Sequence, residues 1–248
     1  MNVQIEKTLS SLRSRCIKGI YAENSEEANQ GILSLIPIRS TVGLGDSTTL
    51  NQMGTIQTLK EKGIRVLDPF EAKRSRADSE EAQQERRRIV REATICDVFL
   101  AGTNAITQDG KIVNVDGAGN RVAGMFWGHP LSIIVVGRNK IVKDLDEAFH
   151  RIRKTIAPNH FRIRAVEMEG RKRKTPCVAT GECNDCRALE RGCNIFTIIE
   201  HKPYHSDICV IIVNQDLGLG WDPSWPADRI DQIKENYKKF VWIPPPVP

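Results

Sequence analysis

Apolar residues at the start of the chain recur at helical spacing. This spacing predicts an amphipathic helix over residues 2–18, whose inward stripe consists of Ile5, Leu9, Leu12 and Cys16. A second helix is expected to begin at Ser25, which can cap it, and to end at Pro37. Short apolar runs at 41–44 and 64–67 then predict two strands, separated by a helix that continues to Glu61.

The alternation of strands and helices continues through the middle of the chain. Apolar runs over 97–101, 111–115 and 132–136 predict three strands, and an Arg-rich helix is expected after Asp78. Asp144, with Glu147 three residues later, marks the start of the most regular amphipathic helix, which we expect to end at Pro158. Strands that alternate with helices favour an α/β fold with a mainly parallel sheet.

Residues 160–194 interrupt this pattern, because they are first basic and then rich in Cys and Gly. Two further strands are expected over 195–200 and 208–213, and residues 242–248 resemble a short extended segment. We therefore expect one α/β domain over residues 1–220, including a Cys-rich metal-binding insertion at 171–194. Residues 221–248 are expected to form a C-terminal tail.

The composition is that of an ordinary globular protein. Of the 248 residues, 40% are hydrophobic and 27% are charged, which excludes a mainly disordered chain. The apolar runs are far shorter than the roughly 18 residues that a membrane span needs, so no span is expected. A net charge of +5 does not predict nucleic-acid binding. Without a signal-peptide pattern, we expect a cytoplasmic protein whose thiols stay reduced or bind metal.

Four of the seven cysteines lie close together in the pattern C-x5-C-x2-C-x6-C: Cys177, Cys183, Cys186 and Cys193. The x2 link is the tight chelate typical of zinc and iron–sulfur sites, and nearby basic residues can lower the thiol pKa. We expect a metal here and favour a [4Fe-4S] cluster over zinc, because zinc ribbons use two such pairs. Uncoordinated thiols or two disulfides are the alternative. Cys16, Cys96 and Cys209 are expected in the core.

A glycine-rich turn follows the strand at 41–44 and opens a helix. Such a turn directs backbone N–H groups and hydroxyls at an anion, although the lysine of a Walker motif is absent. Asp46 adds a negative charge, and an ordinary turn capped by Asp46 is the alternative. The candidate substrate-binding residues of this turn are Gly43, Gly45, Ser47, Thr48 and Thr49.

Polar residues gather again in residues 102–121. The pair Asp109-Gly110 signals a hairpin, which does not explain the Asn, Asp and Arg residues around it. Polar groups at strand ends of α/β sheets bind ligands, whereas turn chemistry alone is the alternative. The candidate substrate-binding residues are Asn104, Asn114, Gly117, Gly119, Asn120 and Arg121, with Arg121 holding a carboxylate or phosphate. The candidate acid–base groups are Asp116, Asp46 and His129.

Several stretches together resemble the LUD-domain, or lactate-utilisation, family over roughly residues 5–220. They are GDSTTLNQMG, GTNAITQDGKIVNVDGAGNRVAG, IIVVGRNKIVKDLDEAFHRIRKTIAP and KTPCVATGECNDCRALERGCNIFTIIEHKP. The cysteine motif is similar to that of the subgroup with a cysteine cluster after the core domain. The resemblance implies a Rossmann-like α/β fold shared with sugar-phosphate isomerases, glucosamine-phosphate deaminases and CoA transferases. It also implies a part in lactate oxidation beside iron–sulfur partner proteins.

Three hypotheses for function follow. The leading one is an iron–sulfur protein that acts in the oxidation of lactate or a related small 2-hydroxy acid, with an iron–sulfur redox partner. The second is an isomerase, hydro-lyase or transferase for a small anionic substrate, with a structural or Lewis-acid metal. The third is a non-enzymatic interaction protein whose basic stretch at 162–174 docks an acidic partner. A homo-oligomer is compatible with each, and whether the chain is itself an enzyme stays open.

Overall fold

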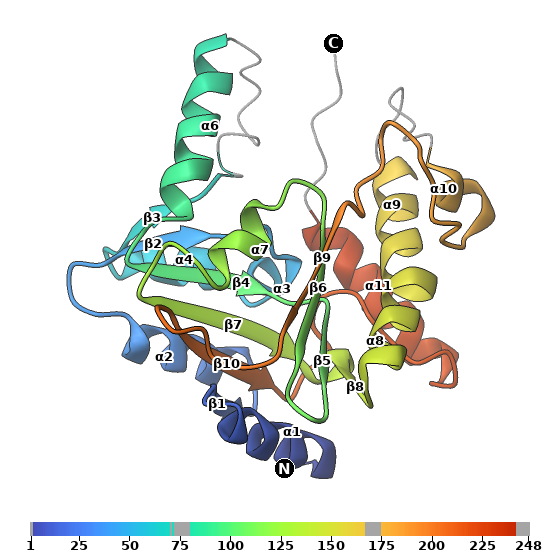
Figure 1. The fold of residues 1–248 in the computed structure, drawn as a ribbon, viewed down its shortest axis with the longest axis horizontal. Coiled ribbons are helices and arrows are strands. Elements are labelled where there is room, and N and C mark those ends of the chain that lie inside the picture. The colour runs from blue at the N-terminus through green and yellow to red at the C-terminus, as the bar shows by residue number, and fades with distance from the viewer. Residues whose placement is uncertain (1, 70, 72–79, 167–174, 242–248) are drawn as a thin grey trace.

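Two β-sheets organise the chain in this computed structural model, which describes residues 2–69, 71, 80–166 and 175–241 (Figure 1). The strands are β1 (Lys18–Ala22), β2 (Thr41–Leu44), β3 (Arg65–Leu67), β4 (Val98–Gly102), β5 (Ala105–Thr107), β6 (Ile112–Asp116), β7 (Leu131–Gly137), β8 (Ile141–Val142), β9 (Ile195–Ile199) and β10 (Asp207–Val213). The helices are α1 (Val3–Ser14), α2 (Ser25–Leu35), α3 (Thr48–Gln52), α4 (Thr55–Glu61), α6 (Glu80–Ala93), α7 (Asn120–Gly124), α8 (Leu145–Arg151), α9 (Ala157–Val166), α10 (Pro176–Thr180) and α11 (Ala227–Phe240).

The larger sheet has the strand order β1-β10-β7-β4-β2-β3, and each neighbouring pair runs parallel. Next to the β1 edge, Ile211 of β10 lies opposite Ile20 of β1 on one side and Val135 of β7 on the other. A parallel sheet whose two faces are covered has continuously apolar strands, as β4 and β7 are here. The predicted α/β fold with a mainly parallel sheet and flanking helices is therefore confirmed.

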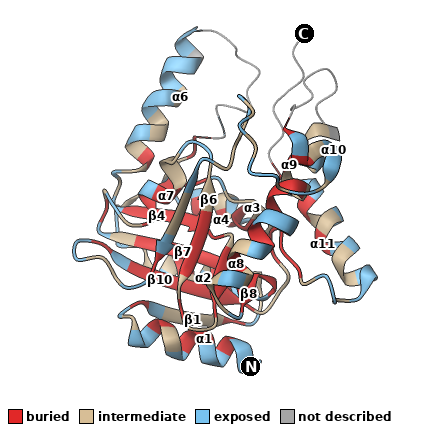
Figure 2. Cartoon of the chain, turned by 45° about the vertical axis from the view of Figure 1, so that its right-hand side comes forward, coloured by how far each residue is buried: buried red, intermediate tan, exposed pale blue. Residues whose placement is uncertain are grey.

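Alternate residues of β10 enter two different cores on the two faces of the larger sheet. Val210 and Ile212 pack in one core with Leu9 of α1. Ile211 packs in the other with Ile32 of α2. A third core lies between the smaller sheet and the helices α8 and α11. Figure 2 shows the result, with mostly buried strands and exposed outer faces on the helices.

The smaller sheet, with the order β8-β5-β6-β9, was not foreseen from the sequence. The strands β5 and β6 form the hairpin that Asp109-Gly110 predicts, and Gly110 has a φ of 86°, which favours glycine. β9, which follows the Cys-rich segment, pairs antiparallel with β6, so that Asn114 lies opposite Thr197. The chain thereby returns from the Cys-rich segment to the polar segment around β6.

The helix that begins after Asp144 does not end at Pro158, which corrects the sequence prediction. Asp144 caps α8 as expected, because its side chain accepts a hydrogen bond from the backbone N–H of Glu147 at 3.0 Å. A π-helical segment at Ile152–Ile156 then precedes the proline. In a π-helix each N–H donates to the carbonyl five residues earlier instead of four. This change of hydrogen-bond partners accommodates Pro158, which has no N–H, so the helix continues into α9.

Residues 221–248 contain a packed helix, α11, where the sequence analysis placed a tail. Ile233 and Tyr237 of α11 are buried together with Ile152 and Ile156. The spacing of Ile233 and Tyr237 is that of one helical face, and this face rests on the domain. The helix therefore belongs to the domain and carries residues that line the pocket described below.

The cysteines outside the Cys-rich segment occupy different environments. Cys209 is buried in a core as predicted, and Cys96 is half-buried against another. Cys16, however, is exposed. Because α1 ends at Ser14 and Cys16 takes a φ of 56°, its side chain leaves the helical stripe.

Among the described residues, no helix combines the length and the apolar character that crossing a membrane requires. Asp78, residues 167–174 and residues 242–248 lie outside the described residues. Three predictions therefore concern residues that are wholly or largely outside this description. They are the helix cap at Asp78, the basic docking stretch at 162–174 and the extended segment at 242–248.

Candidate functional site

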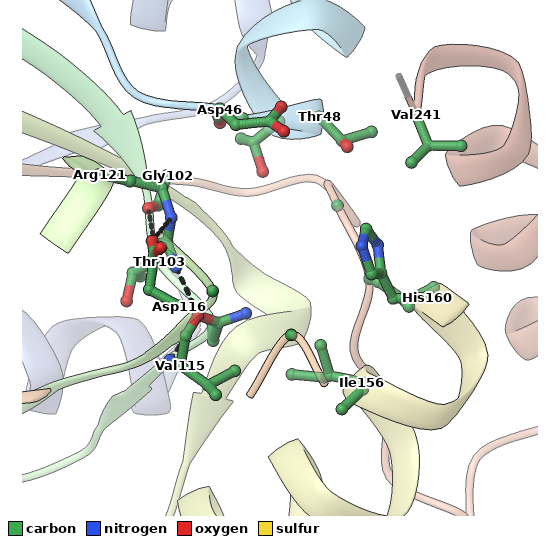
Figure 3. A pocket seen from close by; sticks show the side chains of 18 of the residues that line it. Asp46, Thr48, Gly102, Thr103, Val115, Asp116, Arg121, Ile156, His160 and Val241 are labelled. Atoms are coloured by element: carbon green, nitrogen blue, oxygen red, sulfur yellow. Dashed lines mark hydrogen bonds and ion pairs between the residues drawn. The ribbon is translucent and has the colours of Figure 1, made fainter. Parts of the chain in front are cut away.

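A pocket with a volume of about 320 Å³ lies beyond the carboxyl ends of β2, β4 and β7 (Figure 3). This edge of a parallel sheet is where α/β proteins bind ligands. Both polar segments singled out in the sequence contribute to its lining: Asp46, Ser47, Thr48, Thr49, Asn104, Asp116, Gly117, Asn120 and Arg121. The structure therefore brings the two segments together at one cavity.

Residues 46–49 form one wall of the pocket. Ser47 caps α3 by accepting a hydrogen bond from the backbone N–H of Leu50 at 3.3 Å. Gly102 lets Ser47 approach β4, since a methyl group at residue 102 would lie 2.6 Å from Ser47 Oγ. Thr49 is buried, and its Oγ1 accepts a hydrogen bond from Lys140 at 3.0 Å. This wall presents a row of hydroxyls beside a lysine.

Arg121 connects the strands and turns of the opposite wall. Its two Nη atoms donate hydrogen bonds of 2.7–3.1 Å to Gly102 O, Asn114 Oδ1, Asn104 Oδ1 and Val115 O. Its Nε lies 3.2 Å from Asp116 Oδ2. These contacts account for all the N–H donors of a guanidinium group. A substrate carboxylate could form a hydrogen bond with Arg121 only by displacing one of these protein contacts. Arg121 is therefore better placed to stabilise a bound anion through its positive charge than through a direct hydrogen bond.

Asp116 is equally engaged with the protein. Its Oδ1 accepts hydrogen bonds from the backbone N–H groups of Ala118 at 3.1 Å and Gly119 at 2.8 Å, while Oδ2 faces Arg121. Burial lowers the pKa of Arg121, and the nearby Asp116 and Asp46 oppose that shift. Asp116 therefore shapes the turn that carries Gly117 into the pocket wall.

Lys140 places a buried amine in the pocket. It lies in the turn after β7, is 6% exposed, and donates hydrogen bonds to Thr49 Oγ1 at 3.0 Å and Thr103 O at 2.9 Å. Burial, with a smaller contribution from the charge of Arg121, lowers the pKa of Lys140 to about 7. The amine therefore loses its proton far more readily than that of an exposed lysine, whose pKa is about 10.4. A lysine in that state suits proton transfer or nucleophilic attack.

The helices α9 and α11 provide the third wall. His160 Nδ1 lies 2.7 Å from Tyr237 Oη, and His160 Nε2 lies 3.5 Å from Arg164 Nη1. Burial raises the pKa of Tyr237, whereas a hydrogen bond with Thr48 lowers it. Figure 3 shows His160 across the pocket from Gly102, Thr103 and Arg121, with Thr48 above it in the view. Aromatic and cationic groups of the two helices thus face the wall that carries Arg121.

The Cys-rich segment closes on the same pocket through Gly192 and Cys193. The backbone N–H of Asn194 donates to Asp116 O at 3.0 Å, and Asn194 Nδ2 donates to Gly117 O at 3.0 Å. The segment is therefore fastened to the turn between β6 and α7, and one of its cysteines faces the cavity.

The four predicted metal ligands are free thiols in this segment: Cys177, Cys183, Cys186 and Cys193. Burial raises the pKa of Cys193 to about 11; the nearby Cys183 and Cys177 add to the shift and Arg191 opposes it. At Cys193 the effect of burial therefore outweighs the lowering of the thiol pKa that we expect from nearby basic residues. Arg191 also holds the loop by donating to Cys186 O at 2.6 Å and Cys193 O at 2.9 Å.

The donor chemistry of these thiols fits a metal, because four cysteines supply the ligand number of a [4Fe-4S] cluster or a zinc ion. The four thiols are not arranged around a common point in this structure. In the part of the chain that the structure describes, no three His, Cys, Asp or Glu side chains are placed to hold a metal ion.

Other predicted residues support the pocket from behind its lining. Asn114 is buried and accepts hydrogen bonds from Arg121 and from the backbone N–H of Asn104. Gly119 begins α7 with a φ of 91°. At Gly45, a methyl group would lie 2.7 Å from Arg121 Cγ. These residues position Arg121 and its partners.

His129, a predicted acid–base residue, is not one of the described residues that line the pocket. It is buried and stacks on Phe99 with 5.4 Å between the ring centroids. Burial lowers the pKa of its imidazole. The structure therefore gives His129 a place in the packing rather than at the cavity.

Gly43 permits close packing between β2 and the end of α6. A methyl group at residue 43 would lie 2.6 Å from Cys96 Sγ and would also collide with Ala93 O. We expect Gly43→Ala to lower the free energy of unfolding by about 1–3 kcal/mol, as overpacking does, measured by urea denaturation. The control is Gly31→Ala in α2, where the methyl group would meet Ile211 at an ordinary 3.9 Å. Equal stabilities of the two variants would contradict the role of Gly43 in packing.

Sequence reasoning missed pocket residues that come from elements it did not foresee. His160 and Arg164 lie beyond Pro158, and Tyr237 lies in α11. Lys140 had a usable signal, since a lysine that directly follows a buried parallel strand lies at the carboxyl edge of the sheet.

Comparison with known proteins gives a family match and distant similarities to solved structures. The sequence matches the LUD domain family over residues 5–213. A DUF162 family protein from Deinococcus radiodurans is 14% identical, with coverage of 85% of this chain and 96% of that chain and a TM-score of 0.44. Ribose 5 phosphate isomerase A from Neisseria gonorrhoeae is 13% identical, with coverage of 59% and 67% and a TM-score of 0.31. No curated protein matches the chain.

Proposed function

Since this chain belongs to the LUD domain family, we propose that it takes part in the oxidation of lactate or a related small 2-hydroxy acid. Membership of this family supports a role related to lactate utilisation. The observation that carries the proposal is the pocket, where the guanidinium group of Arg121, 11% exposed, and the buried amine of Lys140 lie beside a wall of hydroxyls. A small carboxylate needs such a positive and hydrogen-bonding environment.

In this proposal different pocket residues bind the carboxylate and the hydroxyl group of the substrate. The hydroxyls of Thr48 and Thr49 donate to the carboxylate, and the charge of Arg121 stabilises it from behind. Asp46 lies at the pocket edge, where it accepts the proton of the substrate hydroxyl. Asp116 stays with Arg121 and holds the turn.

The four cysteines hold a [4Fe-4S] cluster in this proposal, with zinc as the alternative metal. When bound, such a cluster supplies one-electron transfer. One observation supports the placement: Cys193 lines the substrate pocket, so a cluster held there would lie beside the bound acid. An iron–sulfur partner protein would then receive the electrons.

Anaerobic purification tests the proposed cofactor. We expect the wild-type protein to contain iron and sulfide and to be brown, with absorbance that falls on reduction and on addition of lactate. Cys186→Ser is expected to lower the bound iron at least about tenfold, because it removes a ligand. The control is Cys16→Ser, which changes an exposed thiol outside the Cys-rich segment and should leave the iron content unchanged.

Two results would contradict different parts of the proposal. Zinc without iron in anaerobic protein would contradict the cluster. A cluster whose absorbance lactate, glycolate and other small 2-hydroxy acids leave unchanged would contradict the oxidation.

A second candidate function is an isomerase, hydro-lyase or transferase for a small anionic substrate. It is favoured by the pocket's own acid–base groups, Lys140 and Asp46, which can move protons without electron transfer. Turnover that survives Cys186→Ser but is abolished by Asp46→Asn would support this function over the first.

A further inference from the structure

The amine of Lys140 donates two hydrogen bonds, which is the number of N–H donors that an uncharged amino group has. Its Nζ donates to the Thr103 carbonyl at 2.9 Å and to Thr49 Oγ1 at 3.0 Å. Two acceptors account for the two N–H bonds of an uncharged amino group. The lone pair of the nitrogen is then directed away from both partners, and the amine lines the pocket.

The surroundings of this amine offer little to stabilise a charge. Among the described residues, Lys140 has no carboxylate within ion-pairing distance, since its partners are a hydroxyl and a carbonyl. The charged and titratable groups that share the pocket are Arg121, Asp46, Asp116, His160, Arg164, Cys193 and Tyr237. The charge of Arg121 opposes protonation of the lysine. Desolvation together with a neighbouring cation is the combination that activates a nucleophilic lysine.

Gly218 keeps the space around the amine clear. It has a φ of 68°, and a methyl group there would collide with Lys140 Nζ and lie 2.8 Å from Thr49 Oγ1. The lysine, the threonine and the glycine thus come from three separate segments of the chain and meet at one point. This arrangement fixes the position of the amine at the cavity wall.

We propose that Lys140 is a carbonyl-reactive amine that forms an imine with a small 2-oxo acid bound in the pocket. The class of acid rests on the proposed function, because a 2-oxo acid is the oxidised form of a 2-hydroxy acid. The hydroxyls of residues 47–49 and the charge of Arg121 receive its carboxylate, as they do that of the hydroxy acid.

The chemistry is balanced without a further reagent. The lone pair of Nζ attacks the 2-oxo carbon, a C–N bond forms, and the carbonyl electron pair moves to oxygen. Both amine protons pass to that oxygen, which leaves as water when the C=N bond forms. The products are the imine and one water molecule.

Borohydride trapping tests the proposal on the wild-type protein. Glyoxylate or pyruvate is added at pH 7, borohydride delivers hydride to the imine carbon, and peptide mass spectrometry locates the stable secondary amine. We expect at least about tenfold more adduct at Lys140 than at an ordinary exposed lysine, which is almost fully protonated at this pH. The internal reference is Lys143, whose side chain is 81% exposed. Adduct spread evenly over exposed lysines, or none at Lys140, would overturn the proposal.

Two variants show whether the trapped adduct forms on Lys140. Lys140→Arg is expected to abolish the adduct, and Lys143→Arg to retain it. Because a buried substitution can impair folding, the adduct map of the wild-type protein decides the question if Lys140→Arg does not fold. The trapping needs neither metal nor turnover. Adduct without lactate-dependent reduction would therefore contradict the proposed function alone, and reduction without adduct would overturn the imine at Lys140 alone.

Discussion

Replacing Arg121 with methionine is expected to lower the free energy of unfolding by about 3–5 kcal/mol, the usual cost of removing one partner from a buried ion pair. The side chain is 11% exposed and connects Asp116, two asparagine side chains and two backbone carbonyls. Methionine fills a similar volume but leaves these oxygens without a donor. Urea denaturation of the wild type and the variant measures the difference.

A matched control for this prediction is Arg88→Met in α6. Arg88 also forms ion pairs, with Glu85 and Glu92, but its side chain is 57% exposed. Exposed pairs contribute no more than about 1 kcal/mol, so this variant should lose little stability. If Arg121→Met loses no more than Arg88→Met, the connecting role of Arg121 is wrong.

The contribution of Lys140 to the free energy of unfolding is expected to increase with pH between about 7 and 10.5. In the folded protein burial lowers the pKa of Lys140 to about 7 from its ordinary value of 10.5. Between these values the unfolded chain binds a proton that the folded protein does not, so raising the pH favours the folded state. The full shift corresponds to at most about 5 kcal/mol.

The variant Lys140→Met isolates this contribution, because other groups that titrate in the same range are common to both proteins. The charged and titratable groups that share the pocket with Lys140 are Arg121, Asp46, Asp116, His160, Arg164, Cys193 and Tyr237, and the wild type and the variant both carry them. We expect the variant to be more stable than the wild type at pH 7 and the difference to shrink toward pH 10.5. A difference that is the same at both pH values would show that Lys140 is charged in the folded protein.

Local signals predicted several elements with little error. The run Thr41–Leu44 is a strand with the predicted bounds, because apolar residues there are flanked by turn-forming ones. The cap at Asp144 is confirmed together with its reciprocal contact, since Glu147 Oε2 accepts a hydrogen bond from the backbone N–H of Lys143 at 2.6 Å. Such features depend on residues that are neighbours in the sequence.

The remainder of the site depends on contacts that sequence spacing does not reveal. Proline ordinarily ends a helix, and only the π-helical segment before Pro158 brings His160 into the pocket. Tyr237 reaches the pocket because α11 packs on the domain, a contact between segments that are distant in the sequence. The sequence predicts Arg121 as a cationic binding residue. Most of the oxygen atoms that accept its hydrogen bonds, however, lie on β4 and β6. Such partners become visible only when the sheets are assembled.

The position of β10 in the larger sheet has a consequence for the order in which the chain can fold. β10, residues 207–213, lies between β1 at the start of the chain and β7. On the ribosome, residues 18–22 emerge long before the strand with which they pair, and β7 presents an open edge until the same strand arrives. Contacts between such distant parts of a sequence slow folding. The nascent chain must therefore protect the unpaired edges of β1 and β7 until residues 207–213 have been synthesised.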